Sequence, residues 1–116
     1  MSDFTEYIIS PDGIIKDAIQ LINNNKSRCV IVADSNLKVF GVISEGDILR
    51  QILSGMNIYT PIKKVININF KFLKKKNKYK ALNIFKNYGI TLIPIVNEEF
   101  VLEDIITIKD FLIDLD

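Results

Sequence analysis

The sequence predicts an α/β (α+β) fold made of two copies of one strand–helix–strand–strand–helix unit. The first indication is Gly41–Ile48, which has the pattern of a buried strand entering the first turn of a helix, with a hydroxyl and a carboxylate three residues apart at the junction. The second is Asp104–Phe111, which repeats this pattern 63 residues later (41 + 63 = 104). A period this long, present twice, predicts a pseudo-twofold pair rather than a solenoid.

The composition is that of an ordinary globular domain. Of the 116 residues, 48% are hydrophobic and 25% are charged, and the net charge of +1 gives no reason to expect nucleic acid or a membrane as partner. No apolar run approaches the roughly 18–20 residues that span a bilayer, and the first residues lack the pattern of a signal peptide. The single cysteine, Cys29, excludes an internal disulfide. We therefore expect a cytoplasmic protein.

The residue inventory argues against an enzyme. The chain has no histidine, which removes Ser-His and Cys-His nucleophile pairs and most zinc sites. It has no GxGxxG, GxxxxGK[ST] or CxxC motif. The spacing of the carboxylates indicates neither a metal site nor an acid–base pair. We expect no catalytic residues, no metal and no cofactor.

The first half predicts the order strand, helix, strand, strand, helix. Its elements are a strand at Tyr7–Ile9, a helix from Ile14 to about Asn24, strands at Cys29–Ala33 and Leu37–Ser44, and a helix at Asp47–Leu53. The turn sequence Ser10–Gly13 ends the first strand and offers Ser10 or Asp12 as a helix cap. The run at Cys29–Ala33 is continuous and rich in β-branched residues, as is typical of a buried strand.

The second half repeats this order after a linker at Met56–Lys64. Its predicted elements are strands at Val65–Phe70, Leu92–Val96 and Phe100–Thr107 and helices at Tyr79–Tyr88 and Asp110–Leu115. We place the two repeats at residues 1–58 and 59–116. Each half is too small to bury its own sheet, so we expect the halves to pack on each other.

The two junctions, Ser44 with Asp47 and Thr107 with Asp110, allow two interpretations. A hydroxyl followed three residues later by an acid is a capping box, which satisfies free amides at a helix start. Both copies use Asp, however, whereas the box favours the longer Glu or Gln. A helix start is also an anion site, and a short carboxylate can accept both hydroxyls of a ribose. The two roles are compatible.

The unit ends in G-hydrophobic-x-[ST]-x-x-D-hydrophobic and resembles a cystathionine β-synthase (CBS) domain, and the tandem copy resembles a CBS pair, or Bateman module. The resemblance covers Tyr7–Leu115 and rests on Ile9–Asp12, on Ile93–Asn97 and on the two junctions. More narrowly, Glu45–Gly55 followed by Val65–Asn67 is similar to CBS pairs that precede bacterial sugar-phosphate nucleotidyltransferase domains. The catalytic domain that this likeness implies is absent from these 116 residues.

The resemblance implies a regulatory module that binds an adenosyl nucleotide (AMP, ADP, ATP or S-adenosylmethionine) in two clefts between the repeats, and that controls an attached or partner enzyme. It implies that Asp47 and Asp110 hold riboses, with Ser44 and Thr107 near the ribose or phosphate. The other implied contacts are Ile9, Ser10, Arg28, Cys29, Val30, Thr91, Leu92 and Ile93. Arg28 is the cation best placed for a phosphate, or else a solvated loop charge. The Cys29 and Leu92 runs are also buried strand core.

The second repeat departs from the pattern. It has Asp104 where the pattern has Gly, and Leu73–Lys74 where the first repeat has Ser10–Pro11. One cleft is therefore expected to be degenerate, and we favour the cleft that holds Ser44 and Asp47.

Two charge clusters complete the sequence. Lysines crowd the start of the third predicted helix, at Lys71, Lys74, Lys75, Lys76, Lys78 and Lys80. We interpret them as a solvated face; the alternative is attraction of phosphates or an acidic partner, and the interleaved aromatic residues make nucleic acid a disfavoured third choice. The last nineteen positions carry seven acidic residues, and this asymmetry of sign fits a homodimer. The alternative to nucleotide sensing is a structural oligomerisation module with empty clefts.

Overall fold

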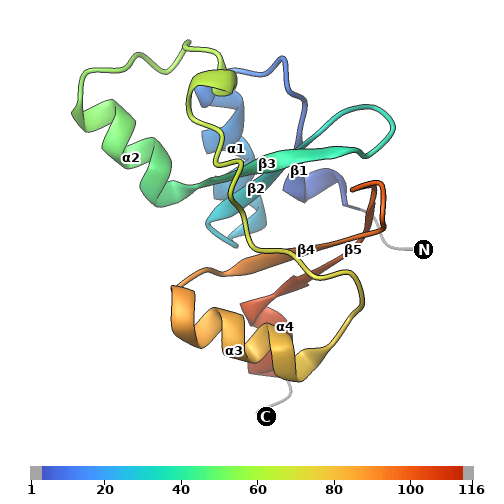
Figure 1. Ribbon diagram of the computed structural model, residues 1–116. Coiled ribbons are helices and arrows are strands. Elements are labelled where there is room, and N and C mark those ends of the chain that lie inside the picture. Colours follow the sequence, from blue (N-terminus) through green and yellow to red (C-terminus); the bar gives the residue numbers. More distant parts are fainter. Residues whose placement is uncertain (1–3, 114–116) are drawn as a thin grey trace.

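The computed structural model of the chain describes residues 4–113, with side chains as far as Phe111. In chain order its elements are η1 (Thr5–Tyr7), β1 (Ile8–Ile9), α1 (Ile15–Asn25), β2 (Cys29–Ala33), β3 (Val39–Ser44), α2 (Glu45–Leu53), η2 (Ile62–Lys64), α3 (Lys78–Tyr88), β4 (Leu92–Val96), β5 (Leu102–Thr107) and α4 (Ile108–Ile113). In Figure 1 the elements from β1 to α2 form the upper half, and those from α3 to α4 form the lower half. The predicted α/β repeat is confirmed. Residues 114 and 115 of the last predicted helix lie outside the described residues.

The two halves share one pairing pattern at an offset of 63 residues. The antiparallel ladders begin at Cys29↔Ser44 in β2–β3 and at Leu92↔Thr107 in β4–β5 (29 + 63 = 92; 44 + 63 = 107). Each ladder has an irregularity before its last pair, again at equivalent positions. Helices α1 and α3 are both 11 residues long, and each is followed by a left-handed residue, Lys26 or Gly89. The duplication is therefore present in the backbone geometry as well as in the sequence.

The two sheets pack face to face across a shared core. Because side chains alternate along a strand, Val30 and Val32 of β2 pack in the core of the first half. Ile31, between them, points the other way and packs with Leu92 and Val96 of β4. The outer face of the second sheet is covered by its own helices (Figure 1) in a third core cluster. The expectation that the halves pack on each other is confirmed.

The prediction of a strand at Val65–Phe70 is wrong. In this stretch the structure has one isolated bridge, in which Asn67 pairs with Val42 of β3. The side chain of Asn67 then accepts a hydrogen bond from the backbone N–H of Asn69 at 2.9 Å. Such a local side-chain bond turns the chain and ends the pairing. The linker therefore continues beyond Lys64 as far as Lys71, and it lies on β3 at Asn67 instead of forming a strand of the second sheet.

The counterpart of β1 comes later and is one residue out of step with the 63-residue offset. Leu73 bridges Ile95 in parallel, as Ile9 pairs with Val32 in the first half. The alignment of Leu73 with Ser10 is therefore wrong, because Leu73 takes the place of Ile9. The second repeat has one residue fewer before its first helix, and this shift is invisible to an ungapped comparison.

The linker is fastened to both halves. Its carbonyls at Ile58 and Thr60 accept hydrogen bonds from Lys16 and Ile15, at 2.8 and 3.0 Å. These N–H groups belong to the first turn of α1, where no carbonyl of the helix itself reaches them. The chain then runs from the upper half past β3 to the lower half (Figure 1). This path gives the linker a place in the wall of the site described next.

Candidate functional site

A cleft of about 640 Å³ lies between the two halves. Its walls are the ends of β2 and β3, the first turns of α2, the linker, and the residues between α3 and β4. The lining residues are Arg28, Cys29, Val42, Ser44, Glu45, Gly46, Asp47, Leu49, Arg50, Asn67, Asn69, Phe70, Lys71, Tyr88, Gly89, Ile90, Thr91 and Leu92. The volume is in the range of ordinary small-molecule sites, and both repeats contribute to it.

The junction of β3 and α2 forms a reciprocal cap at the cleft. The Ser44 hydroxyl accepts a hydrogen bond from the Asp47 N–H at 3.1 Å. The Oδ2 atom of Asp47 accepts one from the Ser44 N–H, also at 3.1 Å. The capping interpretation is thus confirmed for this pair. The cap engages the Oδ2 atom of Asp47 and leaves the other carboxylate oxygen, Oδ1, to another partner.

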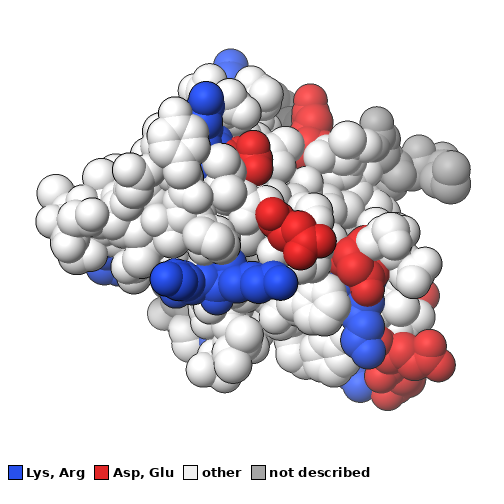
Figure 2. Space-filling view, turned by 90° about the horizontal axis from the view of Figure 1, so that it is seen from above, with Lys and Arg blue, Asp and Glu red and all other residues white. Residues whose placement is uncertain are grey.

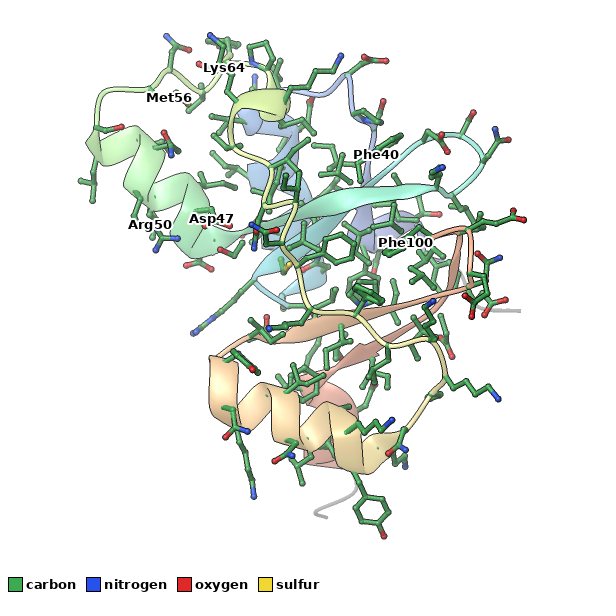
Figure 3. The ribbon with its side chains drawn as sticks, viewed as in Figure 1. Phe40, Asp47, Arg50, Met56, Lys64 and Phe100 are labelled. Atoms are coloured by element: carbon green, nitrogen blue, oxygen red, sulfur yellow. The ribbon has the colours of Figure 1, made fainter. Side chains whose placement is uncertain are left out.

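Arg50 holds that second oxygen. Its Nη2 atom lies 2.6 Å from Oδ1 of Asp47, one helical turn away, and Figure 3 shows the two side chains next to each other on α2. The side chain of Arg50 is 70% exposed and that of Asp47 is 26% exposed. An ion pair this exposed contributes less than about 1 kcal/mol. A ligand that offers two hydroxyls to Asp47 can therefore displace the guanidinium, which stays beside the cleft.

Two further cations line the cleft from different elements. Arg28 precedes β2 and is exposed, and Lys71 belongs to the linker, with its Nζ atom 4.1 Å from the centroid of the Tyr88 ring. With Arg50, three cations face two carboxylates, Glu45 and Asp47. The site is therefore suited to an anion. The sequence prediction missed Arg50, Lys71 and Tyr88; the position of Arg50 three residues after Asp47 was a usable signal.

Arg28 has a left-handed backbone, with φ of 62°. This conformation costs a non-glycine residue roughly 1–2 kcal/mol, so we expect Arg28→Gly to keep or raise the free energy of unfolding. If the guanidinium binds a phosphate, the same variant should weaken nucleotide binding about tenfold, or roughly 1.4 kcal/mol. Calorimetric titration and urea unfolding measure the two effects.

Lys26 is the matched control for this prediction. It is exposed, has φ of 57° and does not line the cleft. Lys26→Gly should change stability in the same way and leave affinity unchanged. Equal losses of affinity in both variants would show that backbone geometry, rather than the Arg28 charge, was responsible.

Cys29 lies in the cleft wall as a neutral group. Burial raises the pKa of its thiol to about 12, and the nearby Asp47 carboxylate adds to that rise, while a backbone hydrogen bond from Ile43 lowers it. The reactive form of cysteine is the thiolate. Cys29 therefore supplies shape and apolar contact rather than a nucleophile.

The structure gathers half of the predicted site residues in this cleft. Arg28, Cys29, Ser44, Asp47, Thr91 and Leu92 line it. Val30 and Ile93 are one residue further along their strands, and their fully buried side chains pack in the cores of the two halves. Ile9 is also a core residue. Ser10 is exposed in the turn before α1, where its hydroxyl accepts a hydrogen bond from the Asp12 N–H.

Thr107 and Asp110 form the second junction. Thr107 is 6% exposed, and its N–H donates to Oδ2 of Asp110 at 2.9 Å. This bond is equivalent to the one from the Ser44 N–H to Asp47, so one of the two bonds of the first cap recurs in the second repeat. Asp104 is accommodated at the edge of this half, with its carboxylate 3.5 Å from the amine of Lys76.

Within residues 4–113, no group of three or more His, Cys, Asp or Glu side chains is placed to hold a metal ion. Some lysines of the charged cluster are paired, as Lys74 is with Glu98 at 2.9 Å. Figure 2 shows both signs of charge on the face seen from above. Among the helices in the described part of the chain, none is long and apolar enough to cross a membrane.

Comparison with known proteins gives a family match for the first repeat. The family model of the CBS domain matches residues 3–54. The chain as a whole has the fold of a CBS-domain pair: AcuB of Vibrio cholerae superposes with a TM-score of 0.79 at 27% identity over 94% of this chain and 82% of that one. A CBS domain protein of Pyrobaculum aerophilum complexed with AMP has a TM-score of 0.76 at 18% identity, over 93% and 88% of the two chains.

The curated relatives are proteins of different kinds. An uncharacterized 17.7 kDa protein of Acidianus ambivalens is 28% identical over 90% of this chain and 63% of its own length. Inosine-5'-monophosphate dehydrogenase of Nitrosopumilus maritimus is 28% identical over 90% of this chain and 21% of its own length. Arabinose 5-phosphate isomerase GutQ of Escherichia coli K12 is 26% identical over 84% and 30%. The chain thus spans less than two thirds of these relatives, and they do not single out a nucleotidyltransferase.

Proposed function

We propose that this chain is a regulatory module that senses an adenosyl nucleotide of the AMP, ADP or ATP class in the cleft at Asp47. The observation that carries the proposal is the set of groups that line that cleft. It combines a carboxylate with a displaceable partner at a helix start, three cations, and strand ends from both repeats. The carboxylate suits the sugar, the cations suit the phosphate, and the strand ends suit the base.

The proposed roles follow from the positions of the groups. Asp47 accepts the ribose hydroxyls after Arg50 leaves its Oδ1 atom, and Ser44 contacts the ribose or phosphate. Arg28 and Arg50 bind the phosphate, where charge-assisted hydrogen bonds are strongest. Backbone groups at Cys29 and at Thr91 and Leu92 bind the base edge. The AMP complex of the Pyrobaculum aerophilum protein, which shares the fold, supports this class of ligand.

The proposal is tested by thermal unfolding with AMP, ADP, ATP, GTP, CTP and S-adenosylmethionine. A ligand present at 100 times its dissociation constant adds about 2.7 kcal/mol to the free energy of unfolding. For a domain of this size, in which 1 kcal/mol corresponds to about 4 °C, we expect a rise in Tm of roughly 11 °C. The rise should occur with adenosyl ligands and be smaller with GTP and CTP. No rise with any of the six would refute nucleotide sensing.

The regulated enzyme is proposed to be attached to this module or to be a partner of it. Binding shifts such an enzyme only if the nucleotide has different affinities for two arrangements of the pair. The narrower sequence likeness makes a sugar-phosphate nucleotidyltransferase the candidate enzyme. We propose that the module is cytoplasmic, as such an enzyme would be. The relatives that match this chain over part of their length also include a dehydrogenase and an isomerase. Examination of the neighbouring coding sequence for an enzyme domain tests this part.

The second candidate function is a structural oligomerisation module without ligand. It is favoured by an apolar groove between α1 and α2, lined in part by Ile19, Ile48 and Ile52, and by Leu53, which is 86% exposed. The left part of Figure 2, over α2, is largely uncharged. We propose that a homodimer covers this surface. A dimer in analytical ultracentrifugation, with no response to any nucleotide, would favour this function over sensing.

A further inference from the structure

The two junctions differ at the residue just before the aspartate. The first junction has Gly46 there and the second has Lys109 (46 + 63 = 109). A β-carbon on Gly46 would meet the Arg50 guanidinium at 3.3 Å and the Ser44 hydroxyl at 3.8 Å, and these are side-chain atoms at the mouth of the cleft. The first junction therefore has no side chain at the position where the second junction places a long cationic one.

The Lys109 side chain crosses from one repeat to the other. Its Nζ atom donates a hydrogen bond to the backbone carbonyl of Asn25 at 2.7 Å, in a partly buried position, between residues 84 apart in the chain. Asn25 ends α1, and its equivalent in the first cleft is Tyr88 (25 + 63 = 88), which is exposed and lines the open cleft. The lysine thus spans the gap that stays open at the other junction.

The acceptor is held in place by other bonds. Asn25 is 3% exposed, and its side-chain amide donates to the carbonyls of Glu6 at 2.9 Å and Cys29 at 3.1 Å. Its Oδ1 atom accepts the N–H of Ser27 at 2.7 Å. Next to it, the Thr91 hydroxyl donates across the repeats to the Ser27 carbonyl. The carbonyl that receives the Lys109 amine therefore belongs to a residue that is held by several hydrogen bonds at the contact between the halves.

We propose that Lys109 closes the second inter-repeat cleft, so that the chain has one nucleotide site and a latent second one. We call the bond from the Lys109 amine to the Asn25 carbonyl the strap. An adenosyl nucleotide at Asp110 would have to displace the amine from this partly buried carbonyl, whereas the Asp47 cleft has no equivalent lysine. A phosphate could recruit the same amine as a ligand instead, and this is the alternative that the test must separate. The proposal rests on the proposed function for the class of ligand.

The test is the stoichiometry of AMP and ATP binding, measured by calorimetric titration of the full chain. Wild type should bind one nucleotide per chain, and Lys109→Gly, which copies Gly46, should bind two. Lys109→Met keeps most of the length of the side chain without its charge, fills the cleft and should remain at one nucleotide per chain. Circular dichroism and urea unfolding verify that each variant is folded.

The Asp47→Ala background separates this proposal from the proposed function. Asp47→Ala with Lys109→Gly should bind one nucleotide, and addition of Asp110→Ala should abolish that binding. If wild type binds none but Lys109→Gly binds one, the strap stands and sensing at Asp47 fails. A stoichiometry that stays at one in Lys109→Gly, two nucleotides in wild type, or a loss of binding on removal of the amine would each overturn the strap.

Discussion

Gly41→Val is expected to destabilise the protein by about 3–5 kcal/mol. A β-carbon at Gly41 would lie 2.4 Å from Cγ2 of Ile66 and 2.5 Å from the carbonyl oxygen of Asn67, because the linker crosses β3 at this point. The backbone of the linker cannot yield without breaking its two hydrogen bonds to Val42, at 2.9 and 3.1 Å. Urea unfolding measures the loss.

The same variant should impair binding, since the displaced linker supplies the cleft wall at Asn67, Phe70 and Lys71. Gly46→Ala is the control for stability. The nearest neighbour of the added methyl group is the exposed Arg50 side chain, and an alanine suits the first turn of α2, so the free energy of unfolding should stay within about 0.5 kcal/mol of wild type. A Gly41→Val protein as stable as that control would show that the linker does not rest on β3.

Asp47→Ala is expected to weaken nucleotide binding at least about 100-fold. Two hydrogen bonds from a ribose to a carboxylate are each worth roughly 1.5–3 kcal/mol, and every 1.4 kcal/mol is a factor of ten in affinity. The loss of stability should be small by comparison, about 1 kcal/mol, because only the bond from the Ser44 N–H is lost from the cap. Calorimetric titration with AMP gives the affinity.

The chain supplies a matched control in its other repeat. Asp110→Ala removes the equivalent bond from the Thr107 N–H and should cost similar stability, while affinity at the first cleft stays unchanged. Asp47→Asn retains an acceptor for the cap but loses the charge, so it should keep stability and still bind weakly. If Asp110→Ala, rather than Asp47→Ala, abolished binding, the nucleotide would bind at the second junction, and our proposal for Asp47 would be wrong.

The duplication was predictable from the sequence because it is recorded in local patterns. Strands β2 and β4 agree with their predicted bounds, and α1 and α3 agree within a residue, since apolar periodicity and turn residues act over a few positions. The capping junction at Ser44 was predictable for the same reason. Its partner Arg50 was within reach too, as it lies one turn along the same helix.

What only the tertiary structure decided depends on residues that are distant in sequence. Gly41 is in contact with Ile66 and Asn67 because the linker, which follows α2 in the chain, crosses β3 at this point. The same path explains why the predicted strand at Val65–Phe70 is a loop. Lys109 reaches Asn25 across 84 residues. Periodicity fixes which face a side chain takes, but not which distant group it meets. The sequence alone therefore determined two similar halves, and the packing between them made the two junctions different.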